Sequence, residues 1–175
     1  MANQEHLTSI LLPTAYRPRE LARCLSALYS TLDHNMAEVL IGLIDDDDES
    51  LSIASAFPAR IYWRSQSEYH KGAVYAWNKL ARQATGDVLA LFADDLEPQA
   101  HWLTRSLDHL DRMCGGLVGF NDLGTDGNVF AAHFIASRDF LIDAMGGVIF
   151  PPQYFCWWCD REISDKAMAI GKHVW

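Results

Sequence analysis

The segment Gly86-Asp87-Val88-Leu89-Ala90-Leu91-Phe92-Ala93-Asp94-Asp95 is the most informative part of the sequence. Its apolar run, Val88 to Ala93, contains no alternating polar residues and is therefore typical of a strand buried on both faces of a sheet. The run ends in two carboxylates, Asp94 and Asp95. In open α/β sheets, ligands bind just beyond the carboxyl ends of the strands. Because carboxylates are costly to desolvate, the pair indicates either a solvent-facing strand exit or a site for a hard cation such as Mg²⁺ or Mn²⁺.

The rest of the chain alternates between apolar strands and segments with helical spacing. The other expected strands cover Leu7–Leu12, Val39–Ile44, Arg60–Trp63, Gly115–Phe120 and Val129–Ala136, the last two around a polar turn at Asp122–Asn128. The first expected helix begins at Pro18. The others cover Ser50–Ala56, Gly72–Ala84, Gln99–Met113, Arg138–Met145 and Ile163–Ile170. This order predicts a three-layer α/β/α fold around a mostly parallel sheet, with strands of mixed orientation in the second half.

Composition places limits on the function. The 175 residues are enough for one domain over 1–175, and the net charge of −9 argues against a nucleic-acid backbone as the main partner. A phosphate-bearing ligand is compatible with this charge, since a divalent cation reverses the local sign. No signal peptide and no apolar run of the ~20 residues needed to span a bilayer is visible, so the cytoplasm is the default location.

Four cysteines occur: Cys24, Cys114, Cys156 and Cys159. Cys156 and Cys159 have redox or zinc spacing, but zinc normally needs a second pair nearby. We therefore expect buried free thiols, with a metal or redox role as the alternative.

Six motifs in one order extend over nearly the whole chain. They are Leu12-Pro13-Thr14-Ala15-Tyr16-Arg17-Pro18; Ile44-Asp45-Asp46 with Ser50; Gly72, Ala76, Asn78, Ala84, Gly86 and Asp87; Asp94-Asp95-Leu96-Glu97-Pro98 with Trp102-Leu103; Arg138 to Gly147; and Asp160-Arg161-Glu162-Ile163 with Ala167 and Gly171. In this order the chain resembles family 2 glycosyltransferases of the GT-A fold, a Rossmann-like fold that binds nucleotide diphosphate sugars.

The resemblance implies transfer of a sugar from a nucleotide diphosphate sugar to an acceptor hydroxyl, with inversion and with Mn²⁺ or Mg²⁺. It implies a UDP-sugar as the donor and Asp160 as the general base. Asp95 would ligate the metal together with Asp94, which would also approach the ribose. The other residues that it assigns to the nucleotide are Pro13, Thr14, Tyr16, Arg17, Asp45 and Asn78.

The chemistry fits these residue types. A divalent cation stabilises the charge that grows on a departing nucleoside diphosphate. An acceptor hydroxyl needs a carboxylate that takes its proton during attack. Asp160 also has a structural interpretation, as the N-cap of the helix that runs to Ile170. Glu162 is a weaker candidate for contacting the acceptor.

The chain departs from the family pattern at several positions. Ala93 replaces the first Asp of an Asp-x-Asp motif, and Glu97, two residues after Asp95, is a candidate replacement ligand. Tyr16 stands where an Asn is usual. His173 falls earlier than the family's metal-binding His and is expected to face solvent. His133 is expected in the core or the acceptor cleft, and His70 in a loop from which it could reach the donor phosphates.

Alternatives remain open on this evidence. The aromatic residues Phe150, Tyr154, Phe155, Trp157 and Trp158 suit either a sugar-binding cleft or core packing. The protein could bind a sugar nucleotide or glycan without turnover. A sugar-1-phosphate nucleotidyltransferase is disfavoured, because those enzymes usually begin with a Gly-rich phosphate loop. The oligomeric state, the sugar, the base and the acceptor are not predicted.

Overall fold

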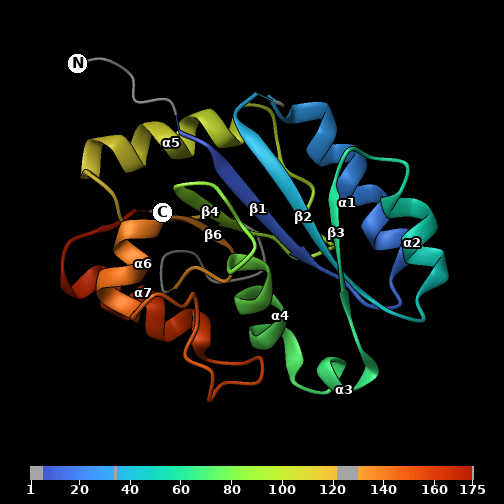
Figure 1. Ribbon diagram of the computed structural model, residues 1–175. Coiled ribbons are helices and arrows are strands. Elements are labelled where there is room, and N and C mark those ends of the chain that lie inside the picture. Colours follow the sequence, from blue (N-terminus) through green and yellow to red (C-terminus); the bar gives the residue numbers. More distant parts are fainter. Residues whose placement is uncertain (1–5, 34, 122–129, 175) are drawn as a thin grey trace.

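The computed structural model describes residues 6–33, 35–121 and 130–174 (Figure 1). In chain order the elements are β1 (Thr8–Pro13), α1 (Pro18–Thr31), β2 (Ala37–Ile44), α2 (Asp48–Ala54), β3 (Arg60–Arg64), α3 (Gln66–Tyr69), α4 (Gly72–Ala81), β4 (Val88–Leu91), α5 (Trp102–Met113), β5 (Leu117–Gly119), β6 (Phe134–Ser137), α6 (Arg138–Met145), α7 (Cys159–Ala169) and β7 (His173–Val174).

The strands form one sheet in the order β3-β2-β1-β4-β6-β5-β7. Strands β1 to β4 are parallel to one another, whereas β6 runs antiparallel to both of its neighbours, β4 and β5. Strand β7 pairs parallel with β5. The predicted mixed, mostly parallel sheet is therefore confirmed. The predicted turn at Asp122–Asn128 lies outside the described residues, and so does Val129, the predicted start of the second hairpin strand.

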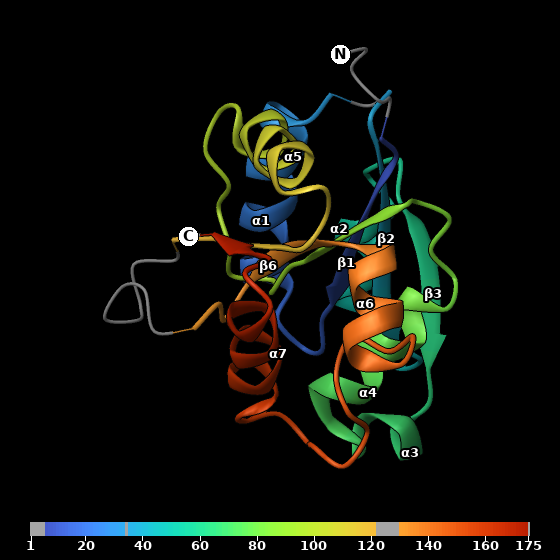
Figure 2. The same ribbon diagram turned by 90° about the vertical axis from the view of Figure 1, so that its left-hand side faces the viewer.

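Helices cover both faces of the sheet (Figure 2). Helices α1, α2 and α5 pack on one face through residues such as Leu25, Ala54 and Leu107, and helices α4, α6 and α7 pack on the other through residues such as Leu80 and Ile163. Each residue of β4 is buried, which explains why its sequence shows no alternation. This layering confirms the predicted three-layer arrangement.

The structure corrects several predicted element boundaries. Helix α4 ends at Ala81 rather than Ala84, and α5 begins at Trp102 rather than Gln99. Helix α7 begins at Cys159, four residues before the predicted Ile163, and its N-cap is Trp158 in a left-handed conformation. Asp160 is therefore inside the first turn, so the N-cap interpretation of this residue is wrong.

Two short elements were not predicted. Helix α3 forms because the side chains of Ser65 and Glu68 close a capping box around its first turn. In strand β7, His173 pairs with Leu117 of β5. His173 was expected to face solvent, but it is half-buried.

All four thiols are free; Cys24 and Cys159 are buried as expected, but Cys114 is exposed at the end of α5. Among the residues that the structure describes, no helix has both the length and the apolar character needed to cross a bilayer.

Candidate active site

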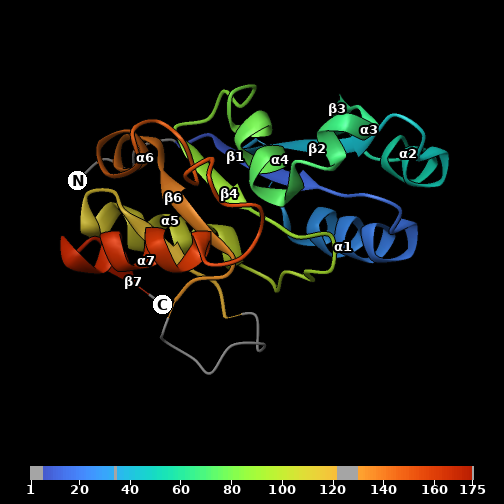
Figure 3. The ribbon, with the colours of Figure 1, turned by 90° about the horizontal axis from the view of Figure 1, so that it is seen from below.

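A cleft with a volume of about 540 Å³ opens at the carboxyl ends of β1 and β4. Figure 3 views the molecule from the side on which α3 and the start of α4 lie. The residues that line the cleft come from four segments: Pro13, Thr14, Ala15 and Arg17; Arg64, Tyr69, His70, Gly72, Ala73 and Trp77; Ala93 and Asp94; and Phe155 and Cys156. The structure thus brings four predicted site residues, Pro13, Thr14, Arg17 and Asp94, to one cavity.

Asp94 is buried at the base of this cleft, with only 4% of the residue exposed. Its carboxylate accepts a hydrogen bond of 2.6 Å from Thr14 Oγ1 and pairs at 2.7 Å with Arg17 Nη1. Burial raises the pKa of Asp94, although Thr14 and Arg17 act in the opposite direction. The first of the two carboxylates is therefore neither solvent-facing nor open; two protein groups already hold it.

Asp95 is exposed, and the same guanidinium holds it. Arg17 Nη2 lies 3.0 Å from Asp95 Oδ2, and the hydrogen bond to Asp95 contributes most to the raised pKa of Arg17. Arg17 therefore bridges both carboxylates with one charge. Its own side chain is 44% exposed, so solvent screens the ion pair and the arginine can move without disturbing the core.

The turn between β1 and α1 is fixed by the acidic run that follows β2. Tyr16 adopts a left-handed φ of 55° and donates its backbone N–H to Asp47 at 2.5 Å. The Tyr16 hydroxyl donates to Asp46, and Asp47 also caps α2 through Ser50. Asp45 is exposed at the carboxyl end of β2. Neither Tyr16 nor Asp45 lines the cleft.

Asn78 has a structural task in α4. Its amide nitrogen donates to the carbonyl of Phe150 at 2.8 Å, and its oxygen accepts from the N–H groups of Ile149 and Phe150. These bonds join α4 to the segment that leads towards α7. The structure does not place Asn78 in the cleft, so its contact with a nucleotide stays a prediction.

Asp160 lies in the first turn of α7 and is half-buried. Its Oδ1 accepts the backbone N–H of Arg161 at 2.9 Å. Burial raises the pKa of Asp160, and the hydrogen bond from the Arg161 N–H opposes the rise in part. A carboxylate with a raised pKa is a better proton acceptor, which suits a general base. Asp160 does not line the cleft around Asp94.

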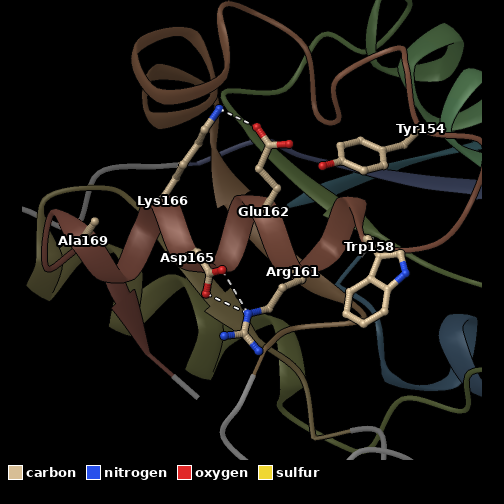
Figure 4. A pocket seen from close by; sticks show the side chains of 7 residues that line it. All are labelled: Tyr154, Trp158, Arg161, Glu162, Asp165, Lys166 and Ala169. Atoms are coloured by element: carbon tan, nitrogen blue, oxygen red, sulfur yellow. Dashed lines mark hydrogen bonds and ion pairs between the residues drawn. The ribbon is translucent and has the colours of Figure 1, made fainter.

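The outer side of α7 carries a separate hollow of about 560 Å³ (Figure 4). Two ion pairs line it, Glu162 with Lys166 at 2.8 Å and Arg161 with Asp165 at 2.8 Å. Trp158, 72% exposed, stands at one end of the helix. Phe155 and Trp157 are exposed as well, whereas Phe150 is buried. The aromatic residues therefore divide between core and surface.

A divalent cation fits this site through a single carboxylate. In residues 6–33, 35–121 and 130–174 no group of three or more His, Cys, Asp and Glu side chains is arranged to hold a metal ion. Mg²⁺ bound with a phosphate ligand commonly uses only one or two carboxylates, and Mn²⁺ prefers the same oxygen donors. Asp95 is exposed and meets this requirement once Arg17 moves aside. Glu97 instead pairs with Arg23 at 3.3 Å.

Sequence reasoning missed several residues of the cleft. Arg64, Tyr69, Trp77 and Cys156 were not assigned to it. His70 and Phe155, which the sequence had offered as a loop residue near the phosphates and as a cleft or core residue, do line it. Trp77 Nε1 donates to the carbonyl of Phe92 and so fixes one wall. For Arg64 a signal existed, since this arginine directly follows the predicted strand Arg60–Trp63 and so lies at the ligand-binding edge of the sheet.

Comparison with solved structures defines the class of protein, a GT-A fold. TarS from S. aureus superposes with a TM-score of 0.76 at 16% identity, over 97% of this chain and 58% of that one. The mannosyltransferase PcManGT from Pyrobaculum calidifontis, solved with GDP-Man and Mn²⁺, has a TM-score of 0.76 at 18% identity, over 98% and 54%. Glucosyl-3-phosphoglycerate synthase from Mycobacterium tuberculosis, solved with UDP, has a TM-score of 0.61 at 17% identity, over 78% and 58%.

Residues 9–166 match the family described as Glycosyl transferase family 2. The chain therefore belongs to glycosyltransferase family 2, as its motifs predicted. No curated protein sequence matches the chain. The chain spans little more than half of the length of these solved structures.

Proposed function

We propose that this protein transfers a sugar from a nucleotide diphosphate sugar to an acceptor hydroxyl, with inversion. One observation carries the proposal. The turn after β1 and the acidic end of β4, far apart in sequence, meet at the cleft through the contacts of Thr14 and Arg17 with Asp94. The family supplies the reaction class, and this cleft supplies a place for the donor within a single α/β/α domain.

In the proposal the nucleotide lies against the turn that follows β1. Pro13, Thr14 and Arg17 line the cavity. Tyr16 and Asp45 border it from the adjoining loops, and Asp45 would accept hydrogen bonds from the base. Asp94, held in place by Thr14, faces the ribose. UDP remains our first choice of nucleotide. GDP is the second, because PcManGT was solved with GDP-Man.

Asp160 acts as the general base in this proposal. The acceptor hydroxyl attacks the anomeric carbon in line, on the face opposite the departing diphosphate, while the carboxylate takes the hydroxyl proton. The bond from the anomeric carbon to the acceptor oxygen forms as the bond to the phosphate oxygen breaks, which inverts the configuration. Burial, which raises the pKa of Asp160, supports the role.

Asp95 would hold the divalent cation, with the donor's phosphate oxygens as further ligands. When bound, the cation supplies Lewis-acid stabilisation of the charge on the leaving diphosphate. Arg17, which this structure pairs with both carboxylates, must leave Asp95 Oδ2 before that oxygen is open to the cation. The arginine would then be free to turn towards the phosphates.

The variant Asp160→Asn tests the base. We expect turnover to fall ~10²–10⁴-fold with donor binding retained, because the amide cannot accept the proton. Release of nucleoside diphosphate from a panel of donor sugars with Mn²⁺ measures turnover, and calorimetry measures donor binding. Asp165→Asn is the matched control, since Asp165 is an exposed aspartate of the same helix. Equal turnover in the Asp160 variant and the wild type would remove this residue from the mechanism.

A second function has one observation in its favour. Arg17 occupies both carboxylates, as expected of a module that holds a sugar nucleotide without a metal and without turnover. The same assay separates the two proposals. A binding module would bind the donor and release no nucleoside diphosphate, whether or not Mn²⁺ is present.

A further inference from the structure

Arg64, the last residue of β3, is a buried cation in the wall of the cleft. Only 5% of the residue is exposed, although an arginine is rarely buried without a paired carboxylate. Desolvation lowers its pKa, yet a guanidinium stays protonated at neutral pH. The fold therefore keeps a positive charge beneath the site where we place the donor.

The hydrogen bonds of Arg64 leave part of its guanidinium unused. Nη2 donates to the carbonyl of Thr14 at 2.8 Å and to that of Gly42 at 3.3 Å. Nε is sealed from solvent and has no acceptor. Among the described residues Nη1 also has no acceptor, but it is not sealed in the same way. Because Arg64 lines the cleft and Nε is sealed, Nη1 is the donor left for a ligand in that cavity.

No carboxylate neutralises this charge. In the part of the chain that the structure describes, Arg64 forms no ion pair. The charge of Glu68 does act on Arg64. The Glu68 carboxylate, however, is bound by Lys79 Nζ at 2.9 Å and by the hydroxyl of Tyr75 at 2.6 Å. An isolated buried charge is costly, so an arrangement like this is typical of a site that an anion completes.

The start of α4 adds a second group of donors to the same cavity. Gly72 and Ala73 both line it, and among the described residues neither N–H has an acceptor. The next amide, that of Val74, already donates to the carbonyl of Phe155 at 3.3 Å. The first amides of a helix carry a partial positive charge and favour phosphate.

We propose that Arg64 and the first turn of α4 form an anion seat that binds the diphosphate of the donor without a metal ion. Two fixed positive groups then face the phosphates from the β3 side, and the acidic side of the cleft is held by Arg17. Nucleotide binding and metal binding then become separable. The anion seat binds the diphosphate of the donor, and the cation at Asp95 would stabilise the charge on the leaving diphosphate. The proposal rests on the proposed function for the identity of the anion.

Inorganic pyrophosphate is the probe, measured by titration calorimetry in the presence of EDTA. We expect the wild-type protein to bind pyrophosphate without metal and Arg64→Gln to bind it about 10- to 100-fold more weakly, the worth of a charge-assisted hydrogen bond. Arg60→Gln is the matched control, because Arg60 lies on the same strand but is exposed and paired with Glu38. It should bind as the wild type does.

Two results would overturn the seat: no pyrophosphate binding by the wild type at millimolar concentrations in EDTA, or equal losses in the two variants. Should Arg64→Gln fail to fold, a wild-type crystal soaked with pyrophosphate in EDTA decides. Phosphate oxygens at Arg64 Nη1 support the proposal, and phosphate elsewhere contradicts it. Loss of the seat leaves the proposed function intact if the donor still binds with Mn²⁺. Failure of the proposed function appears instead as absent turnover.

Discussion

The single side chain of Arg17 binds both carboxylates of the candidate site. Its guanidinium contacts both Asp94 and Asp95, which otherwise would place two negative charges side by side. The two carboxylates differ in burial, so the arginine stabilises a buried charge through Asp94 and an exposed one through Asp95. If the proposed cation binds, it would therefore compete with Arg17 for the exposed carboxylate of Asp95.

Gly72 is a position at which one added side-chain atom, a Cβ, would disturb the cleft. Its φ is +82°, and an added Cβ would overlap the carbonyl oxygen of Phe155 and lie 2.8 Å from the ring of that residue. We therefore expect Gly72→Ala to lower the free energy of unfolding by more than the ~1–2 kcal/mol of a left-handed alanine and to weaken donor binding. Urea unfolding and calorimetry measure the two effects.

Gly146 provides the control for that variant. It has a similar φ of +67°, but nothing lies within 4 Å of the position that a Cβ would take. Gly146→Ala should therefore lower the free energy of unfolding only by the cost of a left-handed alanine and leave donor binding unchanged. Equal losses of stability in the two variants would show that the approach of Phe155 to α4 is not as the structure describes it.

At the scale of elements, Glu38 at the start of β2 ties three segments together. Its carboxylate accepts from Ser9 Oγ at 2.6 Å, from Thr85 N at 2.7 Å and from Arg60 Nη1 at 2.7 Å. The bonds join β1, β3 and the turn before β4 at the edge of the sheet opposite the cleft. Burial raises the pKa of Glu38, but these hydrogen bonds outweigh it, and the pKa is about 2 instead of 4.5.

This depressed pKa gives a pH dependence with a definite sign. The unfolded chain takes up the proton first, so the contribution of Glu38 is complete above pH 4.5 and is lost as the pH falls towards 2. Glu38→Gln should cost about 3 kcal/mol or less at neutral pH and flatten the acid side of the stability profile. Urea unfolding from neutral pH to pH about 3 measures both. Glu49→Gln, at an exposed position of α2, is the control and should keep the wild-type dependence of the unfolding free energy on pH. If Glu38→Gln also kept the wild-type dependence, the hydrogen-bond network around Glu38 would be contradicted.

Elements with a strong local pattern were predictable from the sequence. The continuous apolar runs gave β1, β2 and β4, and Pro18 with the repeated leucines gave α1. Helix α3 has four residues and no apolar periodicity, so its capping box is the only sequence pattern that indicates it. The start of α7 was missed because Trp158 reaches a left-handed conformation that its sequence does not favour.

The site was predictable in its position but not in its contacts. The motifs led to Thr14, Arg17 and Asp94, which the structure joins. The sequence could not show that Asp94 is buried under Arg17, because that depends on how the turn after β1 folds over the end of β4. The sequence placed Arg64 just after a predicted strand, but it could not show that its Nε atom is buried without an acceptor.

At the scale of the whole molecule, strand order creates the cleft. The chain leaves β1 in one direction to form β2 and β3, then returns to form β4 on the other side of β1. The loops after β1 and β4 therefore separate at their common edge and leave a crevice, the position at which open α/β sheets bind ligands. The segment from Phe150 to Trp158 crosses near α4, where Phe155 contacts Gly72 (Figure 3).

We propose that this crevice binds a nucleotide diphosphate sugar. A thermal-unfolding screen of UDP- and GDP-sugars, each with Mn²⁺ and with EDTA, tests it most directly. At a hundredfold excess over its Kd, a donor adds ~2.7 kcal/mol to the stability of the native state. We predict that at least one donor raises Tm, that Mn²⁺ enlarges the shift, and that Gly72→Ala reduces it. An unchanged Tm with every donor, with and without Mn²⁺, would contradict the account.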